Sequence, residues 1–439
     1  MMSTSFVAMT SRGRGTADKE LQTVHREVVV VGGGFAGLAL ADRLGRDDVE
    51  VLLIDRNNYH QFKPLNYQVA TSQLGISEVG YPLRGIFRRH DSVKVAVGEV
   101  VAIDPDARSV TLADGTVCTA RILVLGVGVD ANFFGVPGAE EHCYPMYTLE
   151  DAERLSRRLI SELDRVDSPL GITSDIDVVI VGGGPTGVEL AGAIAENLRV
   201  VIAPRYDGGI ASKVTVHLVD HGDALLKPFS DASHSYARRE LEQLGVQLHF
   251  GTSVTSVSAD GVELGDGSRI DSDTVVWAGG QRPPSLIADS SLPVGHGGRI
   301  NVNDDLTVTG HDGVYALGDI ALIPDIHGRG GETTSLPQLG SVAQQSGQHA
   351  ARNILADLAG RDRSRFKYRD KGIMAMIGRG AAVAEIGRGR RHIQGHVAFL
   401  AWLGVHVMLL PSAWQRLAAV SSWVTDYGTS LRPRRVNVG

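Results

Sequence analysis

Four consecutive valines, Val28–Val31, lead directly into Gly32-Gly33-Gly34-Phe35-Ala36-Gly37. An unbroken apolar run of this kind predicts a strand that is buried on both faces. The apolar segment Leu38–Leu44 predicts a helix after the glycines, and the run Val51–Ile54 predicts a neighbouring strand. Strand, turn, helix and strand in this order predict a βαβ unit in an α/β fold.

The glycine turn has the chemistry of a dinucleotide site. Its G-x-G-x-x-G spacing places glycine at three fixed positions: Gly32, Gly34 and Gly37. Glycine lets the chain turn tightly and lets the backbone approach a pyrophosphate closely. The phosphate is expected at the helix N-terminus, beside Phe35 and Ala36, where unpaired N–H groups favour negative charge. Asp55 follows about twenty residues later, where an acid meets ribose hydroxyls. The alternative is a glycine-rich turn that binds nothing.

The same order of elements returns about 150 residues later. Val178–Val181 leads into a second glycine turn and a helical segment, Val188–Ala195, and a strand then ends in Asp220. Short strands with Asp-Gly turns complete both halves. The second set of nucleotide-binding candidates is Gly182, Gly184, Pro185, Thr186, Gly187 and, after the last strand, Gly280. A duplication with this period predicts two dinucleotide-binding domains.

A late strand assigns the two cofactors. The apolar stretch Gly313–Leu317 runs into Gly318 and Asp319, and this carboxylate can meet the sugar-like chain of a flavin. The first site is therefore predicted to hold FAD and the second a nicotinamide cofactor, with hydride transfer between them. Asp220 favours NADH, because a carboxylate repels the 2′-phosphate of NADPH. Taken alone, the late strand is also consistent with a simple turn.

Composition narrows the function. The net charge of -7 gives no basic footprint for nucleic acid. The two cysteines, Cys118 and Cys143, lack C-x-x-C spacing, and the fifteen histidines lack metal-ligand spacing, so neither thiol chemistry nor a metal site is expected. Residues 1–25 are interpreted as a disordered leader without a signal-peptide core. No run reaches the ~18 apolar residues of a transmembrane helix.

The sequence resembles the type II NADH dehydrogenases, single-subunit FAD enzymes that pass electrons from NADH to membrane quinone. The resemblance spans roughly residues 27–427. Besides the glycine turns, it rests on these stretches: Asn57–Thr71, Asn132–Gly135, Trp277–Pro283, Gly318-Asp319, Tyr368–Gly372 and the aromatic C-terminus. It implies two Rossmann-like domains plus a C-terminal amphipathic helical segment. The expected division is FAD binding by 26–145 and 311–372, NADH binding by 146–310, and membrane association by 373–439.

The resemblance also implies roles for single residues. Glu189 is similar to the family's acid near the nicotinamide–flavin stack, Gln345 to the second glutamine of its Ala-Gln-x-Ala-x-Gln motif, and Lys371 to its lysine near the flavin edge. These three are the expected catalytic residues. The alternatives are an acid in the first helical turn for Glu189 and a solvated turn lysine for Lys371.

This chain departs from the family pattern on the acceptor side. Ser341 stands in place of the motif's first glutamine, and Lys63 and Asn66 interrupt a loop that usually reads Phe-Gln-Pro-Leu-Leu-Tyr. The loop Asn57–Thr71 is polar and aromatic, which favours an exposed functional loop over core. Pro411–Trp414 replaces a more familiar turn.

The C-terminal segment predicts peripheral attachment to the cytoplasmic face of the cell membrane. Val397–Leu410 is largely apolar but too short to span a bilayer, so a helix there would lie at the surface. The rings suited to the interface are Trp402, Trp414, Trp423 and Tyr427, and the arginines that would attract anionic lipid are Arg432, Arg434 and Arg435. The alternative is a hairpin buried against the protein or in a homodimer interface.

The predicted activity is thus a respiratory, non-electrogenic NADH:quinone oxidoreductase. Two alternatives stay open. One is a relative with a repurposed acceptor side, acting on a soluble quinonoid or other small aromatic compound. The other is a non-catalytic nucleotide-sensing flavoprotein.

Overall fold

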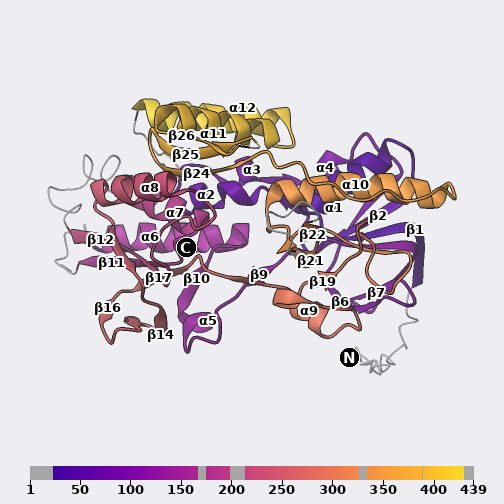
Figure 1. The fold of residues 1–439 in the computed structure, drawn as a ribbon, viewed down its shortest axis with the longest axis horizontal. Helices are drawn as coiled ribbons and strands as arrows, with labels where there is room; N and C mark the ends of the chain where they lie inside the picture. Colours follow the sequence, from indigo (N-terminus) through magenta and orange to yellow (C-terminus); the bar gives the residue numbers. More distant parts are fainter. Residues whose placement is uncertain (1–22, 167–174, 198–212, 326–333, 388, 430–439) are drawn as a thin grey trace, which may run out of the picture.

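The computed structural model describes residues 23–166, 175–197, 213–325, 334–387 and 389–429. Two α/β halves lie side by side, and the C-terminal helices α11 (His396–Leu409) and α12 (Ala413–Thr429) lie together along the top of the molecule (Figure 1). The predicted leader and the arginines of the tail fall largely outside the described residues. β1 begins at Thr23, three residues inside the predicted leader.

The first half is built on a sheet whose central strand is the predicted four-valine strand. Val28–Val31 pair in parallel with Val51–Ile54 on one side and with residues 122–125 on the other. These valines are at most 4% exposed, as expected for a strand between two layers. In order across the sheet, the strands are β5 (Val93–Val97), β2 (Val51–Asp55), β1 (Thr23–Val31), β8 (Val117–Leu125), β7 (Ser109–Leu112) and β6 (Val100–Asp104), and β20 (Val314–Ala316) pairs with β8.

The second half repeats this core, which confirms the predicted duplication. Its glycine-turn strand again lies between the acid-bearing strand and the last strand of the unit, all in parallel. A hairpin sheet of β14 (Val254–Ser258), β15 (Gly261–Leu264) and β16 (Arg269–Asp271) packs beside it. In order, the strands of the second sheet are β10 (Cys143–Pro145), β17 (Thr274–Trp277), β11 (Ile176–Val181), β12 (Val214–Asp220) and β13 (Gln247–Phe250).

The helix after each glycine turn is held by very close packing. Helix α1 (Phe35–Gly45) lies against α10 (Gly340–Leu358), where a Cβ on Gly347 would collide with the backbone of Ala36. Helix α7 (Pro185–Glu196) begins with the predicted proline at its first position. α7 lies against β24 (Ile373–Gly378), where a Cβ on Gly192 would collide with the carbonyl of Ile377. These contacts fix both turns to elements that come late in the chain.

The remaining helices cover the sheets and join the halves. They are α2 (Asn66–Ala70), α3 (Ile76–Val79), α4 (Leu83–Ile86), α5 (Ala139–His142), α6 (Leu149–Val166), α8 (Asp231–Gln243) and α9 (Ser285–Ala288). Short strands β9 (Asp130–Ala131) and β18 (Gln281–Arg282) pair between the halves. A small sheet of β24, β25 (Ala381–Ile386) and β26 (Arg391–Gln394) packs against α11, so the first part of the predicted membrane segment contains three strands.

The prediction of an exposed loop at Asn57–Thr71 was wrong in its central part. Phe62 and Leu65 are fully buried and Tyr67 is 3% exposed, all in the core cluster beneath α11 and α12. The prediction that Trp402 and Trp423 are interfacial rings was also wrong, because they are 0% and 4% exposed. The C-terminal helices supply the missing layer over this loop. In the described part of the chain, no helix combines the length and apolar character needed to cross a bilayer.

Arg416 closes the turn between α11 and α12. Its Nε donates to the carbonyl of Leu410 at 3.0 Å, and its Nη2 donates to that of Met408 at 3.3 Å. A cation at the end of α11 satisfies carbonyls that the helix leaves unpaired. We expect Arg416→Ala to destabilise the helical pair by about 1 kcal/mol. Urea unfolding followed by tryptophan fluorescence measures it, because three of the four tryptophans lie in these helices. The exposed Arg391→Ala is the control, and an equal shift in both variants would contradict the capping role.

Candidate functional site

The two glycine turns have the same geometry. Gly32 and Gly182 adopt positive φ angles of 104° and 112°, and a side chain on either would meet the neighbouring strand's glycines. A Cβ on Gly37 or Gly187 would collide with the carbonyl of the first glycine in its own turn. In contrast, a Cβ on Gly34 or Gly184 would meet no atom within 4 Å. The first and third glycines are thus required by packing, and the second leaves open space for a ligand to approach the backbone.

The helix N-termini at these turns suit a phosphate. Gly34 and Gly184 are the N-cap residues of α1 and α7, and neither helix has a capping side chain. The first N–H groups of each helix therefore lack a side-chain partner and can bind an anion. Phe35 and Ala36 begin α1, and Pro185 and Thr186 begin α7 and are exposed. Both turns fit the pyrophosphate of a dinucleotide.

The two predicted ribose-binding acids also stabilise the turns. Asp55 accepts hydrogen bonds from the backbone N–H of Gly33 at 2.6 Å and of Asn57 at 2.7 Å. Asp220 accepts in the same way from Gly183 and Gly222. Burial raises the pKa of Asp55, and these N–H donors act against that rise. A carboxylate has about four lone-pair sites, so both acids keep acceptor capacity for a ribose hydroxyl.

The predicted flavin carboxylate lies beside the first turn. The short helix η5 (Gly318–Ile320) follows β20, so Asp319 emerges at the carboxyl edge of the first sheet. A Cβ on Gly318 would touch Ala36 of α1 and Ala343 of α10. Burial raises the pKa of Asp319, and the cations Lys63 and Arg299 lower it. The structure thus brings Asp319 to the N-terminus of α1.

Gly280 lies where the two halves meet. It has a positive φ of 74°, its carbonyl accepts from the hydroxyl of Tyr147, and a Cβ on it would collide with the ring of Phe134. The indole N–H of Trp277 donates to the carbonyl of Asn132 at 2.9 Å. The two family-like stretches Asn132–Gly135 and Trp277–Pro283 therefore form one contact at the second site.

Glu189 is a half-buried residue of α7 that contacts β24. Its Oε1 accepts from the backbone N–H of Met376 in β24 at 3.2 Å. Burial raises the pKa of Glu189 to about 8. The indole N–H of Trp402 opposes this rise, although it makes no hydrogen bond of good geometry. Glu189 in turn raises the pKa of the buried phenol of Tyr67, after burial itself. A carboxyl with this pKa keeps its proton at neutral pH.

Gln345 and Lys371 are joined through one segment. The side-chain amide of Gln345 donates to the carbonyl of Arg369 at 3.1 Å and accepts from its N–H at 3.0 Å. Ser341, one turn earlier on α10, lies 2.9 Å from the hydroxyl of Tyr368. Lys371 follows with an exposed side chain. Gln345 therefore holds the segment that carries Lys371, instead of pointing freely at a ligand.

The three expected catalytic residues are thus connected through one segment, residues 369–376. Gln345 binds this segment at Arg369, Lys371 lies within it, and Glu189 binds it at Met376. Sequence reasoning assigned no role to Tyr67, which lies beside Glu189, or to Tyr147, which lies beside Gly280, and it expected Trp402 at the membrane interface instead of beside Glu189. The family-like stretch Asn57–Thr71 was the available signal for Tyr67, whereas the fold alone brings in the other two.

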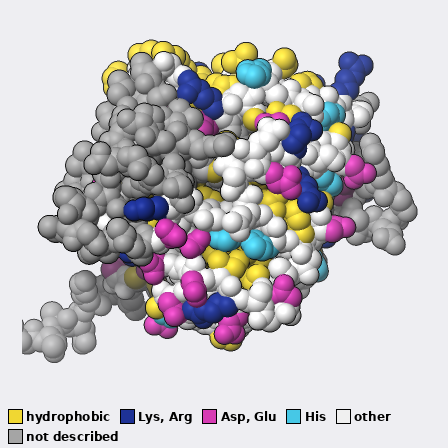
Figure 2. Space-filling model, turned by 90° about the vertical axis from the view of Figure 1, so that its left-hand side faces the viewer, with side chains coloured by type: hydrophobic (Ala, Val, Ile, Leu, Met, Phe, Trp, Pro, Cys, Tyr) yellow, Lys and Arg dark blue, Asp and Glu magenta, His cyan; other side chains and the backbone are white. Residues whose placement is uncertain are grey.

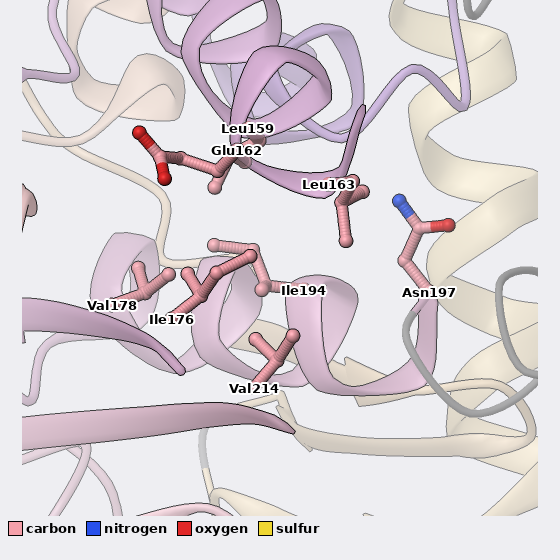
Figure 3. A pocket seen from close by; sticks show the side chains of 8 residues that line it. All are labelled: Leu159, Glu162, Leu163, Ile176, Val178, Ile194, Asn197 and Val214. Carbon is pink, nitrogen blue, oxygen red and sulfur yellow. The ribbon is translucent and has the colours of Figure 1, made fainter. Parts of the chain in front are cut away.

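Other features of the chain do not compete with this site. Burial raises the pKa of both cysteine thiols, that of Cys143 to about 12, so they stay protonated and unreactive. A small cavity in the second half is lined mainly by aliphatic side chains of α6, α7, β11 and β12 (Figure 3). It lies near the first residues of β11 and β12, at the opposite edge of the sheet from the glycine turn.

Known proteins are similar to this chain in sequence. The sequence pattern of the pyridine nucleotide-disulphide oxidoreductase family matches residues 26–347. The chain is 34% identical over 422 residues to the type II NADH:quinone oxidoreductase NdhA of Mycobacterium tuberculosis, which covers 91% of this chain and 86% of that protein. It is 32% identical over 425 residues to Ndh of the same organism, with coverages of 93% and 89%.

Solved structures agree with the predicted fold. NDH2 from Plasmodium falciparum in complex with NADH has a TM-score of 0.85 at 17% identity, covering 93% of this chain and 99% of that chain. The sulfide:quinone oxidoreductase of Aquifex aeolicus has a TM-score of 0.71 at 20% identity, with coverages of 93% and 96%. At these identities the structures establish the fold alone, while the sequence relatives establish the family. The chain belongs to the type II NADH:quinone oxidoreductase family.

Proposed function

We propose that this chain binds NADH at the second glycine turn and FAD at the first, and reduces a quinone beside Glu189 at a membrane surface, without proton pumping. FAD supplies the chemistry that links the two substrates, because it can take two electrons from NADH and pass them to the quinone. The chain's own residues bind, orient and shield the reactants.

The observation that carries the proposal is that all three expected catalytic residues bind to, or lie on, residues 369–376. Glu189 extends from the helix of the second turn, and Gln345 from the helix that packs on the first. One segment therefore connects both turns to the half-buried carboxyl of Glu189. In this position Glu189 can hold a proton near a reducible ring, and Lys371 can supply positive charge nearby. We infer these roles for Glu189, Gln345 and Lys371.

The assignment of FAD to the first turn is supported by Asp319. A flavin has a polyol chain beyond its pyrophosphate, and the half-buried carboxyl of Asp319 beside α1 can accept hydrogen bonds from it. Gly32, Gly34 and Gly37 would hold the pyrophosphate and Asp55 the ribose. At the second turn, Gly182, Gly184 and Gly187 would hold NADH, with Asp220 on its ribose and Gly280 near the nicotinamide.

An exposed apolar surface supports membrane attachment. Hydrophobic side chains gather along the top edge of the molecule, where α11 and α12 lie (Figure 2). They are Val397, Leu400, Val405, Met408 and Leu409 of α11, and Trp414, Leu417, Val420 and Val424 of α12, each more than 40% exposed. We name these nine residues the helical apolar face. Nine exposed apolar side chains, with the indole of Trp414 among them, suit the interface of a bilayer at the cytoplasmic face of the cell membrane. A homodimer that covers it is the second use of this surface.

We expect NADH to reduce the bound flavin at least about tenfold faster than NADPH at equal low concentration, a difference of about 1.4 kcal/mol. The reason is that Asp220 accepts from a 2′-hydroxyl but repels a 2′-phosphate. Rapid mixing under anaerobic conditions, followed at the flavin absorbance, measures both rates. Equal rates would contradict the assigned role of Asp220.

Reoxidation of the reduced enzyme by a panel of quinones then tests the acceptor. Rapid reoxidation by a short-chain quinone, together with sedimentation with membranes, is expected. Reoxidation only by hydrophilic quinonoids, with no membrane binding, would favour a soluble acceptor. Flavin that NADH cannot bleach would favour a nucleotide sensor.

A further inference from the structure

Lys63 is held rigidly beside the first glycine turn. It begins the short helix η1 (Lys63–Leu65), directly after the fully buried Phe62. The ring of Phe35, the first residue of α1, packs edge-on against the rings of Phe62 and His60. The distances between the ring centres are 5.4 Å to Phe62 and 5.3 Å to His60. A ring nitrogen of His60 lies 2.8 Å from the carbonyl of Gly33. The backbone that carries Lys63 is therefore fixed to the turn itself.

The ammonium of Lys63 lies between the two halves. Its Nζ is 5.8 Å from the centre of the Tyr147 ring, and the hydroxyl of Tyr147 donates to the carbonyl of Gly280 at the second site. Two carboxylates attract the ammonium. The stronger attraction comes from Asp319, beside the first turn, and the weaker one from Asp130. Although part of the side chain is exposed, burial around the ammonium lowers the pKa of Lys63.

The positive charge is a feature that packing alone does not require. The side-chain stem can fill its space in a neutral residue, and the family pattern has glutamine at this position. Removing an ammonium from water costs several kcal/mol unless nearby carboxylates compensate. Here the carboxylate that compensates most strongly, Asp319, is the one expected to bind the flavin. The ammonium of Lys63 is therefore stabilised mainly by a residue of the proposed flavin site, and not by charges on the protein surface.

We propose that Lys63 raises the reduction potential of FAD bound at the first turn. Reduction adds electrons to the flavin ring, and a cation at the meeting point of the two sites stabilises the electron-rich form. The interaction is strong there because the ammonium is poorly solvated. This inference rests on the proposed binding of FAD.

The test compares the flavin reduction potentials of the holoenzyme and its Lys63→Gln variant, titrated against a dye of known potential. We expect K63Q to lower the reduction potential of the bound flavin by about 30 mV. For a two-electron couple this equals a shift of about tenfold in the equilibrium toward oxidised flavin. Lys63→Arg keeps the charge and should retain most of the wild-type potential. Arg56→Gln is the matched control, because it removes a nearby cation whose side chain is 55% exposed and therefore screened by solvent.

A potential in K63Q equal to that of the wild type would overturn the proposal, and so would an equal shift in R56Q. Flavin content is measured first in every variant. If K63Q does not retain FAD, Lys63→Met gives the same comparison with the stem intact, and a wild-type potential in that variant also overturns it. A wild-type protein that binds no FAD would instead refute the proposed function.

Discussion

Replacement of Glu189 by glutamine is expected to lower the rate of quinone reduction by about 100-fold or more, the usual effect of losing a general acid. The rate at which NADH reduces the flavin should change much less, by about threefold or less, because glutamine keeps the size of the side chain. Stopped-flow measurement of the two half-reactions separates these effects.

The environment of Glu189 gives the reason for this expectation. The carboxyl is held by the N–H of Met376 and surrounded by the phenol of Tyr67 and the indole of Trp402. Quinone reduction consumes protons as well as electrons, and a carboxyl that is protonated at neutral pH can donate one. The amide of glutamine fills the same space but cannot transfer a proton on the timescale of turnover.

The pH dependence follows from the raised pKa of about 8. Below this value Glu189 carries its proton, and above it the proton is lost, so quinone reduction by the wild type should fall as pH rises through about 8. Because the unfolded chain loses this proton near pH 4.5 and the folded protein near pH 8, the contribution of Glu189 to the free energy of unfolding falls between these two pH values and changes no further above them. In the E189Q variant, neither the rate of quinone reduction nor the stability should show this fall with rising pH.

Glu196→Gln is the matched control on the same helix. Glu196 is also a buried carboxyl, at 4% exposure, and it accepts from the N–H of Arg379 at 2.8 Å. It lies two helical turns further from the second glycine turn. An E196Q variant as slow as E189Q, or an E189Q variant that reduces quinone at the wild-type rate, would contradict the role of Glu189.

The sequence was sufficient for those parts of the site that are local in the chain. The strand, glycine turn, helix and acid lie within 28 residues in the first half (Val28–Asp55) and within 43 in the second (Val178–Asp220), and their order alone specifies how they fold. Asp55 and Asp220 were placed correctly at the strand ends, next to the turns. The sequence did not predict that these acids would also accept hydrogen bonds from the backbone of Gly33 and Gly183, because the pattern shows the spacing of residues but not the direction of a side chain.

The sequence was insufficient where distant segments complete the site. The loop around Phe62 and Tyr67 is polar and aromatic, so its burial depends on a cover that it does not itself encode. Trp402 of α11 and Trp423 of α12 pack over the loop, and the indole N–H of Trp423 donates to the side-chain oxygen of Gln68 at 2.7 Å. The approach of Lys63 to Asp319 likewise joins two short helices that are far apart in the chain, η1 and η5, which local patterns do not specify.

The double variant Trp414→Glu, Leu417→Glu is expected to weaken binding to anionic lipid vesicles by about 100-fold. Burying one large apolar side chain partly in the interface contributes about 1.5 kcal/mol, or roughly tenfold in affinity. Trp414 and Leu417 are 70% and 63% exposed, one turn apart on α12. They can be changed without opening the core, which is formed by Trp402 and Trp423 on the inner sides of the helices. Vesicle sedimentation at fixed lipid concentration measures the effect.

The same variant distinguishes a membrane surface from a dimer interface. Its reduction of a soluble short-chain quinone should stay within about twofold of the wild type, because the helical apolar face contains no residue of the proposed catalytic site. The double variant Gln243→Glu, Gln247→Glu, which adds the same two negative charges at exposed positions on α8 and β13, controls for net charge. If vesicle binding is unchanged and the variant instead sediments at half the mass of the wild type, the face is the contact between two copies. Since a helix pair can meet either lipid or a second copy with the same apolar side chains, only the combined measurement of mass and vesicle binding assigns the surface.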